Sequence, residues 1–318
     1  MNNLCLLPHR IEAYNCYDNN IIFPISKLWS RNIDQYFLND FGFTIVGDYD
    51  VRKRLVSTGN DFSNILLRDF SGVTLESIDT TNMELLYFIK IVETNIVKNK
   101  PIGIKSDSYY CPWSKYYRSV HMEHYFLIMG MVNNKYVNCI DSYFSNQIQS
   151  MSVELVLDTI KEIILFNDVG NTYNNSINKL DQYILQSLSY DTYEKRYDSV
   201  MRLSCLLSYN NIEKEMSRIE KDPNRSTILF SIDYVMKSRK NFYNTLTINN
   251  KNNIVFIPEK LLIDLKEIIR YWEVVKGLII KNLITSNKSY SDKMNGLISL
   301  LAEKESLLHK ELILHFNN

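Results

Sequence analysis

The sequence predicts an α+β fold in which an N-terminal half with an antiparallel sheet precedes a largely α-helical C-terminal half. Up to about residue 150, stretches with helical periodicity alternate with short β-branched and aromatic runs, whereas nearly every later stretch has apolar residues at helical spacing. The chain has 318 residues, of which 45% are hydrophobic, which is enough for one large or two modest domains. We therefore expect domains over residues 1–165 and 166–318.

The N-terminal half begins with "EAYNCYDNNIIFPISKLW" (12–29), which predicts a helix that starts at Cys16. Pro24 is expected to break or bend this helix early, because proline removes a backbone donor. Residues 82–100 have apolar side chains at helical spacing, and the following "PIGIKSD" predicts a short strand.

Two adjacent strands are predicted next, by "EHYFLIMGMV" and "KYVNCIDSYF" on either side of the polar turn "NNK". In such an antiparallel hairpin the start of the first strand lies beside the end of the second. His124 and Asp141, which occupy these positions, are therefore expected within hydrogen-bond reach. Residues 152–166 then predict one helix, capped by Ser152, with its leucines, valine and isoleucines on one face.

The C-terminal half predicts a helical bundle, because each periodic stretch carries an apolar stripe with charges opposite. Basic residues do not dominate the polar faces, so binding to a membrane surface is not expected. The stretches are 176–190, 192–221, 226–246, 258–284 and 293–316.

The amino-acid composition of the chain argues against several classes of function. Lys plus Arg and Asp plus Glu both number 36, so there is no global basic field for nucleic-acid binding. No apolar run approaches the roughly 18 residues of a membrane span, and "MNNLCLLPHRIEAYNC" does not read as a secretory signal because it lacks a basic stretch followed by a long apolar one. The five cysteines are scattered without paired spacing, which favours reduced thiols in the cytoplasm. "HMEH" (121–124) lacks a second ligand pair, so no metal site is expected.

Cys16 is the candidate nucleophile, since a histidine oriented by an acid can take a proton from a thiol. A helix N-terminus at Cys16 would add positive potential that favours the thiolate. Packing roles are expected for the cysteines without such partners, which are Cys5, Cys139 and Cys205.

Three stretches, "NCYDNN", "PIGIKSDSYYCPW" and "HMEHYFLIMGMVNNKYVNCIDSYF", resemble the papain-like cysteine acyltransferases typified by the N-terminal domain of butirosin biosynthesis protein H. The resemblance covers roughly residues 5–165 and implies a papain-like fold. It also implies Cys16 as nucleophile, His124 as base and Asp141 as orienting acid, with His121 as the rival base. The Lys, Asn, Ile and Tyr usage is similar to that of closthioamide-type amide synthases.

One departure from papain-like peptidases concerns the oxyanion hole, because "LPHRIEAYNC" lacks the glutamine that usually donates there. The backbone N–H of Cys16 can supply one donor, and Asn15, His9 or another N–H the second. Arg10 is equally well explained as a surface charge. Substrate-lining roles are expected for Asn15, Tyr109, Tyr110, Cys111 and Trp113.

The resemblance implies an amide-forming acyltransferase of natural-product biosynthesis. Its acyl group would come from the phosphopantetheine thioester of an acyl or peptidyl carrier protein and pass through Cys16 to a small-molecule amine, with no cofactor of its own. The helical half would cover the site, dock the carrier or form a homodimer. Two alternatives remain, a cysteine peptidase or amidase with the same triad, and a non-enzymatic interaction protein in which Cys16 is packed.

Overall fold

Two compact units make up the chain in the computed structural model. The sheet unit comprises Met1–Ile33 and Leu67–Tyr173, and the helical unit comprises Asp34–Leu66 and Asn174–Asn318. The expected division at residue 165 therefore differs from the observed one, chiefly because residues 34–66 belong with the later helices. The structure describes residue 4 and residues 6–45, 56–57, 62–170, 176–219, 226–285 and 287–317.

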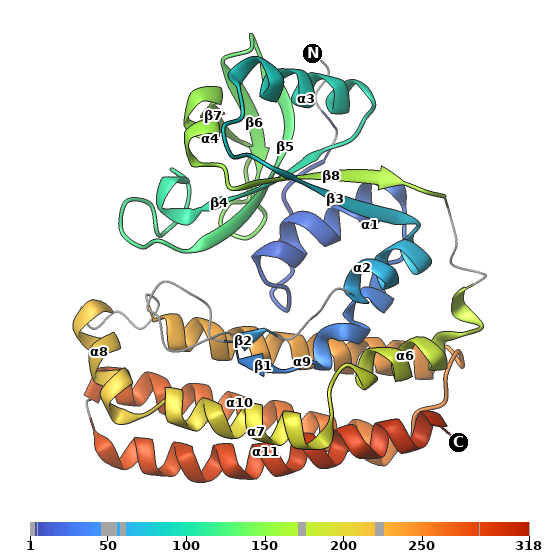
Figure 1. The fold of residues 1–318 in the computed structure, drawn as a ribbon, viewed down its shortest axis with the longest axis vertical. Coiled ribbons are helices and arrows are strands. Elements are labelled where there is room, and N and C mark those ends of the chain that lie inside the picture. The colour runs from blue at the N-terminus through green and yellow to red at the C-terminus, as the bar shows by residue number, and fades with distance from the viewer. Residues whose placement is uncertain are drawn as a thin grey trace. The chain divides into compact units, whose positions relative to one another are not determined.

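The sheet unit is built on six antiparallel strands in the order β3-β8-β4-β5-β6-β7 (Figure 1). The predicted hairpin is confirmed, since Val132 pairs with Tyr136 across a turn whose two asparagines have positive φ. The strands are β3 (Val73–Asp79), β4 (Ile102–Asp107), β5 (Glu123–Val132), β6 (Tyr136–Ile140), β7 (Gln149–Ser152) and β8 (Glu162–Asp168).

The single helix expected over residues 152–166 is wrong in its second half. Helix α4 (Val153–Thr159) is capped as predicted, with Ser152 Oγ accepting from Leu155 N at 3.2 Å. The chain then enters β8, which lies between β3 and β4 and is apolar where it pairs with Ile102 and Ile104. A short apolar run of this kind fits a buried strand and a buried helix equally well by periodicity.

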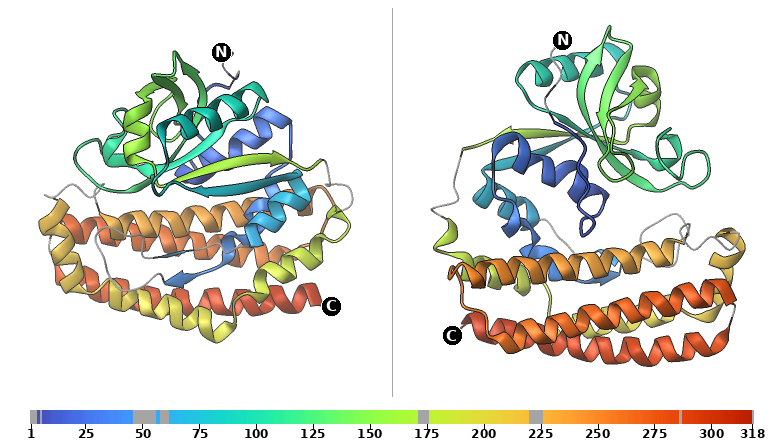
Figure 2. Two further views of the ribbon diagram at one scale, coloured as in Figure 1. Left: turned by 45° about the horizontal axis from the view of Figure 1, so that its top comes forward. Right: turned by 180° about the vertical axis from the view of Figure 1, so that it is seen from behind.

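Helices lie on both faces of this sheet (Figure 2). Helix α3 (Leu85–Val97), within the predicted 82–100, contacts β4 and β5. The helical segment over residues 16–29 contacts β5 from the other face, and it approaches closely at Gly103. A Cβ at Gly103 would lie 2.7 Å from Ile21 Cδ1, so glycine permits this packing distance.

Pro24 does not break the segment, although a break was one of the two outcomes expected of it. A π-helical turn, η1 (Asp18–Ile22), precedes it, and Phe23 N donates to Asp18 O across five residues. Helix α1 (Phe23–Trp29) then takes Pro24 in its first turn, where a missing donor costs little. The helix therefore runs on to Trp29.

The helical unit confirms the expected bundle, in which α9 packs on α10, α10 on α11, and α11 on α7. The periodic stretch over residues 192–221 contains two helices, Tyr193–Leu206 and Tyr209–Ile219. A 3-10 helix, η2 (Asp34–Phe41), and a two-stranded ribbon also belong to this unit. Its other elements are β1 (Thr44–Ile45), β2 (Val56–Ser57), α2 (Phe62–Leu66), α6 (Leu180–Ser189), α7 (Tyr193–Leu206), α8 (Tyr209–Ile219), α9 (Thr227–Lys251), α10 (Glu259–Thr285) and α11 (Lys288–Asn317).

A buried ion cluster fastens residues 34–66 to these helices. Arg239 donates to Glu305 at 2.9 and 2.7 Å and to the carbonyl of Asp40 at 2.8 Å. Burial raises the pKa of Glu305, but the charge and hydrogen bonds of Arg239, the charge of Arg196 and a bond from Trp272 outweigh it and lower the pKa. The early segment thus satisfies a guanidinium that would otherwise be buried without enough acceptors.

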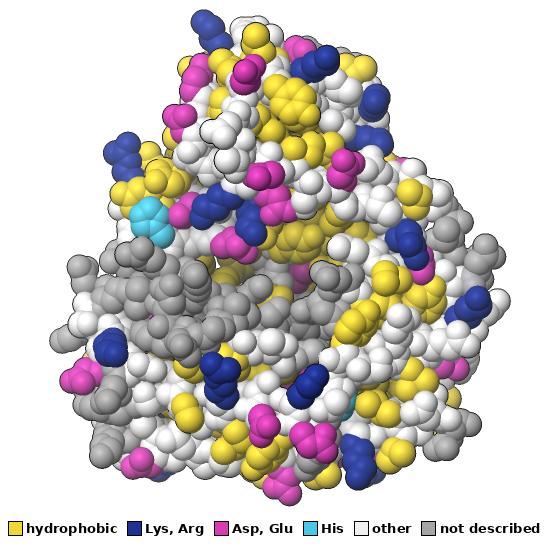
Figure 3. All heavy atoms as spheres, in the orientation of Figure 1, with side chains coloured by type: hydrophobic (Ala, Val, Ile, Leu, Met, Phe, Trp, Pro, Cys, Tyr) yellow, Lys and Arg dark blue, Asp and Glu magenta, His cyan; other side chains and the backbone are white. Residues whose placement is uncertain are grey.

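Among the described helices none is long and apolar enough to cross a bilayer. On the face drawn in Figure 3, cationic and anionic side chains are intermixed.

Candidate active site

The helix that carries Cys16 starts at this residue, as the sequence predicts. Asn15 caps it, because Asn15 Oδ1 accepts from Asp18 N at 2.9 Å while Asp18 Oδ2 accepts from Asn15 N at 3.3 Å. This reciprocal pair is a capping box with aspartate in place of glutamate. The Cys16 side chain consequently lies at the positive end of a capped helix and is 9% exposed.

Asn19 fixes the loop before the nucleophile. Its Nδ2 donates to the carbonyls of Ile11, Tyr14 and Asn15 at 3.0–3.1 Å. Its Oδ1 accepts from Ile11 N at 2.8 Å. One fully buried side chain therefore holds the approach to Cys16 on the first turn of the helix.

His124 and Asp141 lie side by side, as the hairpin predicts. His124 Nε2 is 2.6 Å from Asp141 Oδ2, and the two side chains are 2% and 0% exposed. The contact leaves Nδ1 of the same ring for a second partner, and Cys16 lies near enough to His124 for the two side chains to interact electrostatically. The thiol, the imidazole and the carboxylate are therefore arranged in the order that nucleophilic catalysis by cysteine requires.

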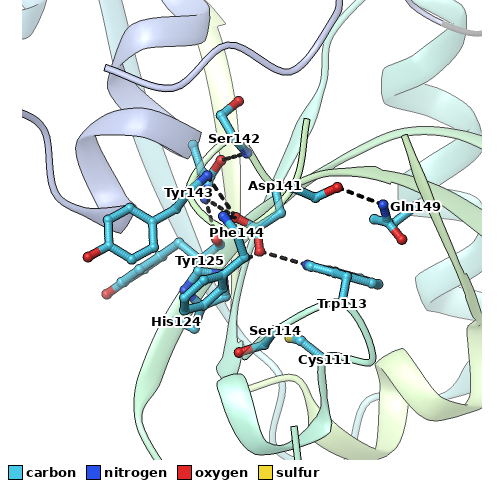
Figure 4. A network of polar contacts seen from close by, with 12 residues as sticks. Cys111, Trp113, Ser114, His124, Tyr125, Asp141, Ser142, Tyr143, Phe144 and Gln149 are labelled. Atoms are coloured by element: carbon cyan, nitrogen blue, oxygen red, sulfur yellow. Dashed lines mark hydrogen bonds and ion pairs between the residues drawn. The ribbon is translucent and has the colours of Figure 1, made fainter. Parts of the chain in front are cut away.

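Further donors converge on the Asp141 carboxylate. Trp113 Nε1 donates to Oδ2 at 2.7 Å (Figure 4), and Asn20 Nδ2 donates to Oδ1 at 2.9 Å. The backbone N–H groups of Tyr143 and Phe144 donate to Oδ1 at 3.1 and 3.3 Å. A buried carboxylate with this many donors stays ionised and fixed in direction.

The electrostatics of the pair follow from these contacts. Burial lowers the pKa of His124, but the charge of Asp141 and the hydrogen bonds to Asp141 and Cys16 outweigh it and raise this pKa to about 10. Burial raises the pKa of Asp141. The charge and hydrogen bond of His124, together with hydrogen bonds from Trp113 and Asn20, outweigh this effect and hold the pKa of Asp141 below its usual range. At neutral pH the site therefore holds an imidazolium against a carboxylate, with Cys16 beside the cation.

Asn20 separates two strands where the site forms. The pairing of β5 with β6 ends at Leu127 and Ile140, and continuing that register would place Tyr125 opposite Ser142. Asn20 Nδ2 instead donates to Tyr125 O at 2.7 Å, and Asn20 Oδ1 accepts from Ser142 N at 2.7 Å. The Asn20 carboxamide therefore takes the place of a direct backbone pairing between Tyr125 and Ser142, and it brings the start of its helix between the two chain segments.

Sequence reasoning missed this role, as it missed that of Asn19. The signal was available, because two consecutive asparagines inside an otherwise apolar helical run need buried partners.

The rival base, His121, belongs to another pair. Its Nδ1 is 2.9 Å from Asp107 Oδ2, its ring stacks on Tyr109 at 4.1 Å between centroids, and its side chain is 55% exposed. Tyr110 lies against the same imidazole at 6.1 Å. Tyr109 and Tyr110, expected to line the substrate site, thus gather around His121.

The remaining cysteines divide by environment. Cys111, expected to line the substrate site, is instead fully buried, and burial raises the pKa of its thiol. Cys139 is likewise buried within β6, and burial raises its pKa. Cys205, expected to pack, is exposed, because it falls on the outer side of α7. Cys5 lies outside the described residues.

Two of the oxyanion-hole candidates can be placed. Because Asn15 Oδ1 caps the helix, its Nδ2 is the end of the carboxamide left to meet a ligand. His9 donates its backbone N–H to Ser142 Oγ at 3.2 Å, and its ring lies 5.5 Å from that of Phe23. Of the two, only Asn15 adjoins Cys16 in the chain.

Within the described residues no group of three or more His, Cys, Asp or Glu side chains is arranged to hold a metal ion. No family model matches the chain, and no curated protein matches it in sequence.

Proposed function

We propose that this protein is a cysteine-dependent acyltransferase with a papain-like sheet unit, which makes an amide by moving an acyl group from a carrier-protein thioester through Cys16 to an amine. The observation that carries the proposal is the buried pair of His124 and Asp141, 2.6 Å apart, with Cys16 near enough to His124 for their charges to interact. A triad of this order performs acyl transfer in cysteine enzymes.

The first half-reaction forms the acyl-enzyme. The Cys16 thiolate attacks the thioester carbonyl, and the oxyanion that develops is met by the Cys16 N–H and Asn15 Nδ2. The bond to the carrier sulfur breaks, and the proton of the His124 imidazolium goes to the departing thiolate. Asp141 keeps the ring in the orientation this transfer needs.

The second half-reaction uses neutral His124 as base. An amine attacks the Cys16 thioester, its proton passes to His124, and the carbon–sulfur bond to Cys16 breaks to release the amide. Such a transfer succeeds only where water is kept from the acyl-enzyme.

An aromatic surface close to Cys16 suits the amine. Tyr17 and Tyr125 meet edge to face at 4.9 Å, and Tyr125 O–H donates to Glu123 Oε1 at 3.1 Å, a carboxylate that is itself paired with Lys105 at 3.2 Å. Aromatic faces attract ammonium groups, and Lys105 Nζ already lies 5.9 Å from the centroid of the Tyr125 ring. Tyr125 lies close enough to Cys16 for their charges to interact, so an amine held there would be near the acyl-enzyme.

A cysteine peptidase or amidase could use the same triad, and the test separates the two. Wild-type protein incubated with an acyl-pantetheine thioester should gain one acyl mass in intact-mass spectrometry, whereas Cys16→Ala should gain none. A primary amine should then discharge the mass as amide. Discharge as free acid at every amine concentration, with a peptide amide cleaved instead, would replace the proposal by hydrolysis.

The proposed setting is the cytoplasm. Cys16, Cys111, Cys139 and Cys205 are free thiols in the structure, and a catalytic thiolate needs a compartment that keeps it reduced.

A further inference from the structure

A pocket of about 300 Å³ lies within the sheet unit. Three of its walls are aromatic, and Figure 4 shows Tyr143 and Phe144 beside His124 and Trp113 beneath Asp141. The lining residues are Arg10, Trp113, Ser114, Lys115, Tyr143 and Phe144.

Two walls of the pocket also contact the candidate triad. The Phe144 ring lies 4.6 Å from the His124 ring between centroids, and Trp113 Nε1 donates to Asp141 Oδ2 at 2.7 Å. A group bound in this pocket would therefore touch the side chains that hold the imidazole and the carboxylate in place. The pocket is part of the surroundings of the reaction and not a remote depression.

The charge of the pocket is positive. Arg10 and Lys115 are its charged members, and none of the six lining residues is acidic. The Arg10 guanidinium lies 5.0 Å from the centroid of the Tyr143 ring and forms no ion pair with any carboxylate in the described part of the chain. An arginine that stacks on an aromatic ring keeps its edge free for a bidentate contact with a carboxylate or phosphate.

We infer that this pocket binds an anionic group, a carboxylate or a phosphate, of the acyl donor. The inference rests on the proposed function, because that function supplies a donor. It assigns the anion to the donor because the Arg10 cation would repel the ammonium form of the amine acceptor. The anion belongs either to the acyl chain or to the pantetheine arm, and both offer the same chemistry to Arg10.

The test compares donors that differ in one charge. Acetyl-4′-phosphopantetheine against acetyl-pantetheine isolates a phosphate on the arm, and succinyl-pantetheine against butyryl-pantetheine isolates a carboxylate on the acyl chain. The rate of acylation of Cys16 is followed by intact mass over a range of donor concentrations. One of the two anionic donors should reach half-maximal rate at a concentration about tenfold lower than its neutral counterpart.

Variants then assign this preference to the pocket. Arg10→Gln should abolish the advantage of the anionic donor, and Arg10→Lys should retain part of it because the charge remains while the fork is lost. Lys135→Gln, which removes an exposed cation at the turn between β5 and β6, is the matched control and should leave the advantage intact. Unchanged alkylation of Cys16 by neutral iodoacetamide would show that Arg10→Gln preserves the triad.

Three outcomes would count against the inference. The inference would be overturned if charged and neutral donors reached half-maximal acylation rate at equal concentrations in the wild type. It would also be overturned if the advantage of the anionic donor survived Arg10→Gln. Either result leaves the proposal of acyl transfer standing. If no thioester acylates Cys16 while iodoacetamide still alkylates it, the proposed function fails, and the assignment to a donor fails with it.

Discussion

His124 can satisfy its two partners in one ring orientation only. With Nε2 held 2.6 Å from Asp141 Oδ2, only Nδ1 is left on the ring for a thiol, and Cys16 is near enough to His124 to influence its pKa. Sequence alone could place the histidine beside the aspartate, because both flank one tight hairpin. It could not show the contact with the thiol, which joins a helix near residue 16 to a strand more than a hundred residues later.

The choice between the two histidines gives the first prediction. His124→Gln should lower the rate of Cys16 alkylation by iodoacetamide at neutral pH by at least about tenfold, because it removes the imidazolium beside the sulfur. His121→Gln should change this rate less than about twofold, since His121 pairs with Asp107. Peptide mass spectrometry at limiting reagent measures both. A larger loss in the His121 variant would reverse the assignment.

The same pair predicts how stability depends on pH. The folded-state pKa of His124 is raised from 6.5 to about 10, so its contribution is fully present below about pH 6.5 and is lost as pH rises through about 10. Hydrogen-exchange protection of the β5 amides should therefore exceed that of His124→Gln most at pH 6, and the difference should shrink toward pH 10. A difference that grows with pH would contradict the sign.

At the scale of secondary-structure elements, the helical segment over residues 16–29 reaches between β5 and the residue after β6. Asn15 sets where the helix begins, Asn19 ties down the loop before it, and Asn20 bridges β5 to the residue after β6. The helix start was predictable from local sequence, because capping is local. The bridge was not, because its partners lie 105 and 122 residues away.

Removing the bridge should therefore cost both stability and reactivity. Asn20→Ala leaves the carbonyl of Tyr125 and the N–H of Ser142 without partners, at a cost of about 2–4 kcal/mol in the free energy of unfolding. It also removes a donor to Asp141 and should slow Cys16 alkylation. Asn95→Ala, which deletes an asparagine bonded within α3, is the comparison for the alkylation rate. Equal rates in the two variants would show that the bridge does not position the triad.

The close approach at Gly103 offers a matched pair of substitutions. Gly103→Ala would place its Cβ 2.7 Å from Ile21 Cδ1 and 3.0 Å from Ile164 Cβ, and should destabilise the sheet unit by about 1–3 kcal/mol. Ile21→Val deletes that Cδ1 atom. Combined with Gly103→Ala it should restore part of the stability, measured by urea unfolding. Additive losses in the double variant would rule out the steric account.

At the scale of the whole molecule, neither unit is one continuous stretch of the chain, because each combines two separate stretches. Helical periodicity after residue 174 made the bundle predictable. Residues 34–66 were assigned to the wrong side because their partners, Arg239 and Arg196 above all, contribute single buried contacts that leave no periodic trace. The apolar run of β8 was ambiguous for the related reason that a central strand is buried on both faces.

This division predicts the behaviour of a fragment. Residues 1–173 alone should be poorly soluble, because residues 34–66 then lack the helices against which Phe37, Leu38 and Phe41 are buried. A version in which a short Gly/Ser linker replaces residues 34–66 should be more soluble, as measured by the soluble fraction on expression. Equal solubility of both fragments would show that this segment does not depend on the later helices.

That residues 34–66 belong to the helical unit also affects how the protein folds during synthesis. During synthesis, residues 34–66 leave the ribosome long before α9 and α11, and Thr245 donates to the carbonyl of Asp34 across 211 residues. The sheet unit can close its strands once residue 168 has emerged, while the looped-out segment waits with its apolar side chains uncovered. Contacts of such separation fold slowly and expose nascent chains to aggregation. Pausing of translation or chaperone capture between residues 66 and 305 should therefore affect the yield of folded protein.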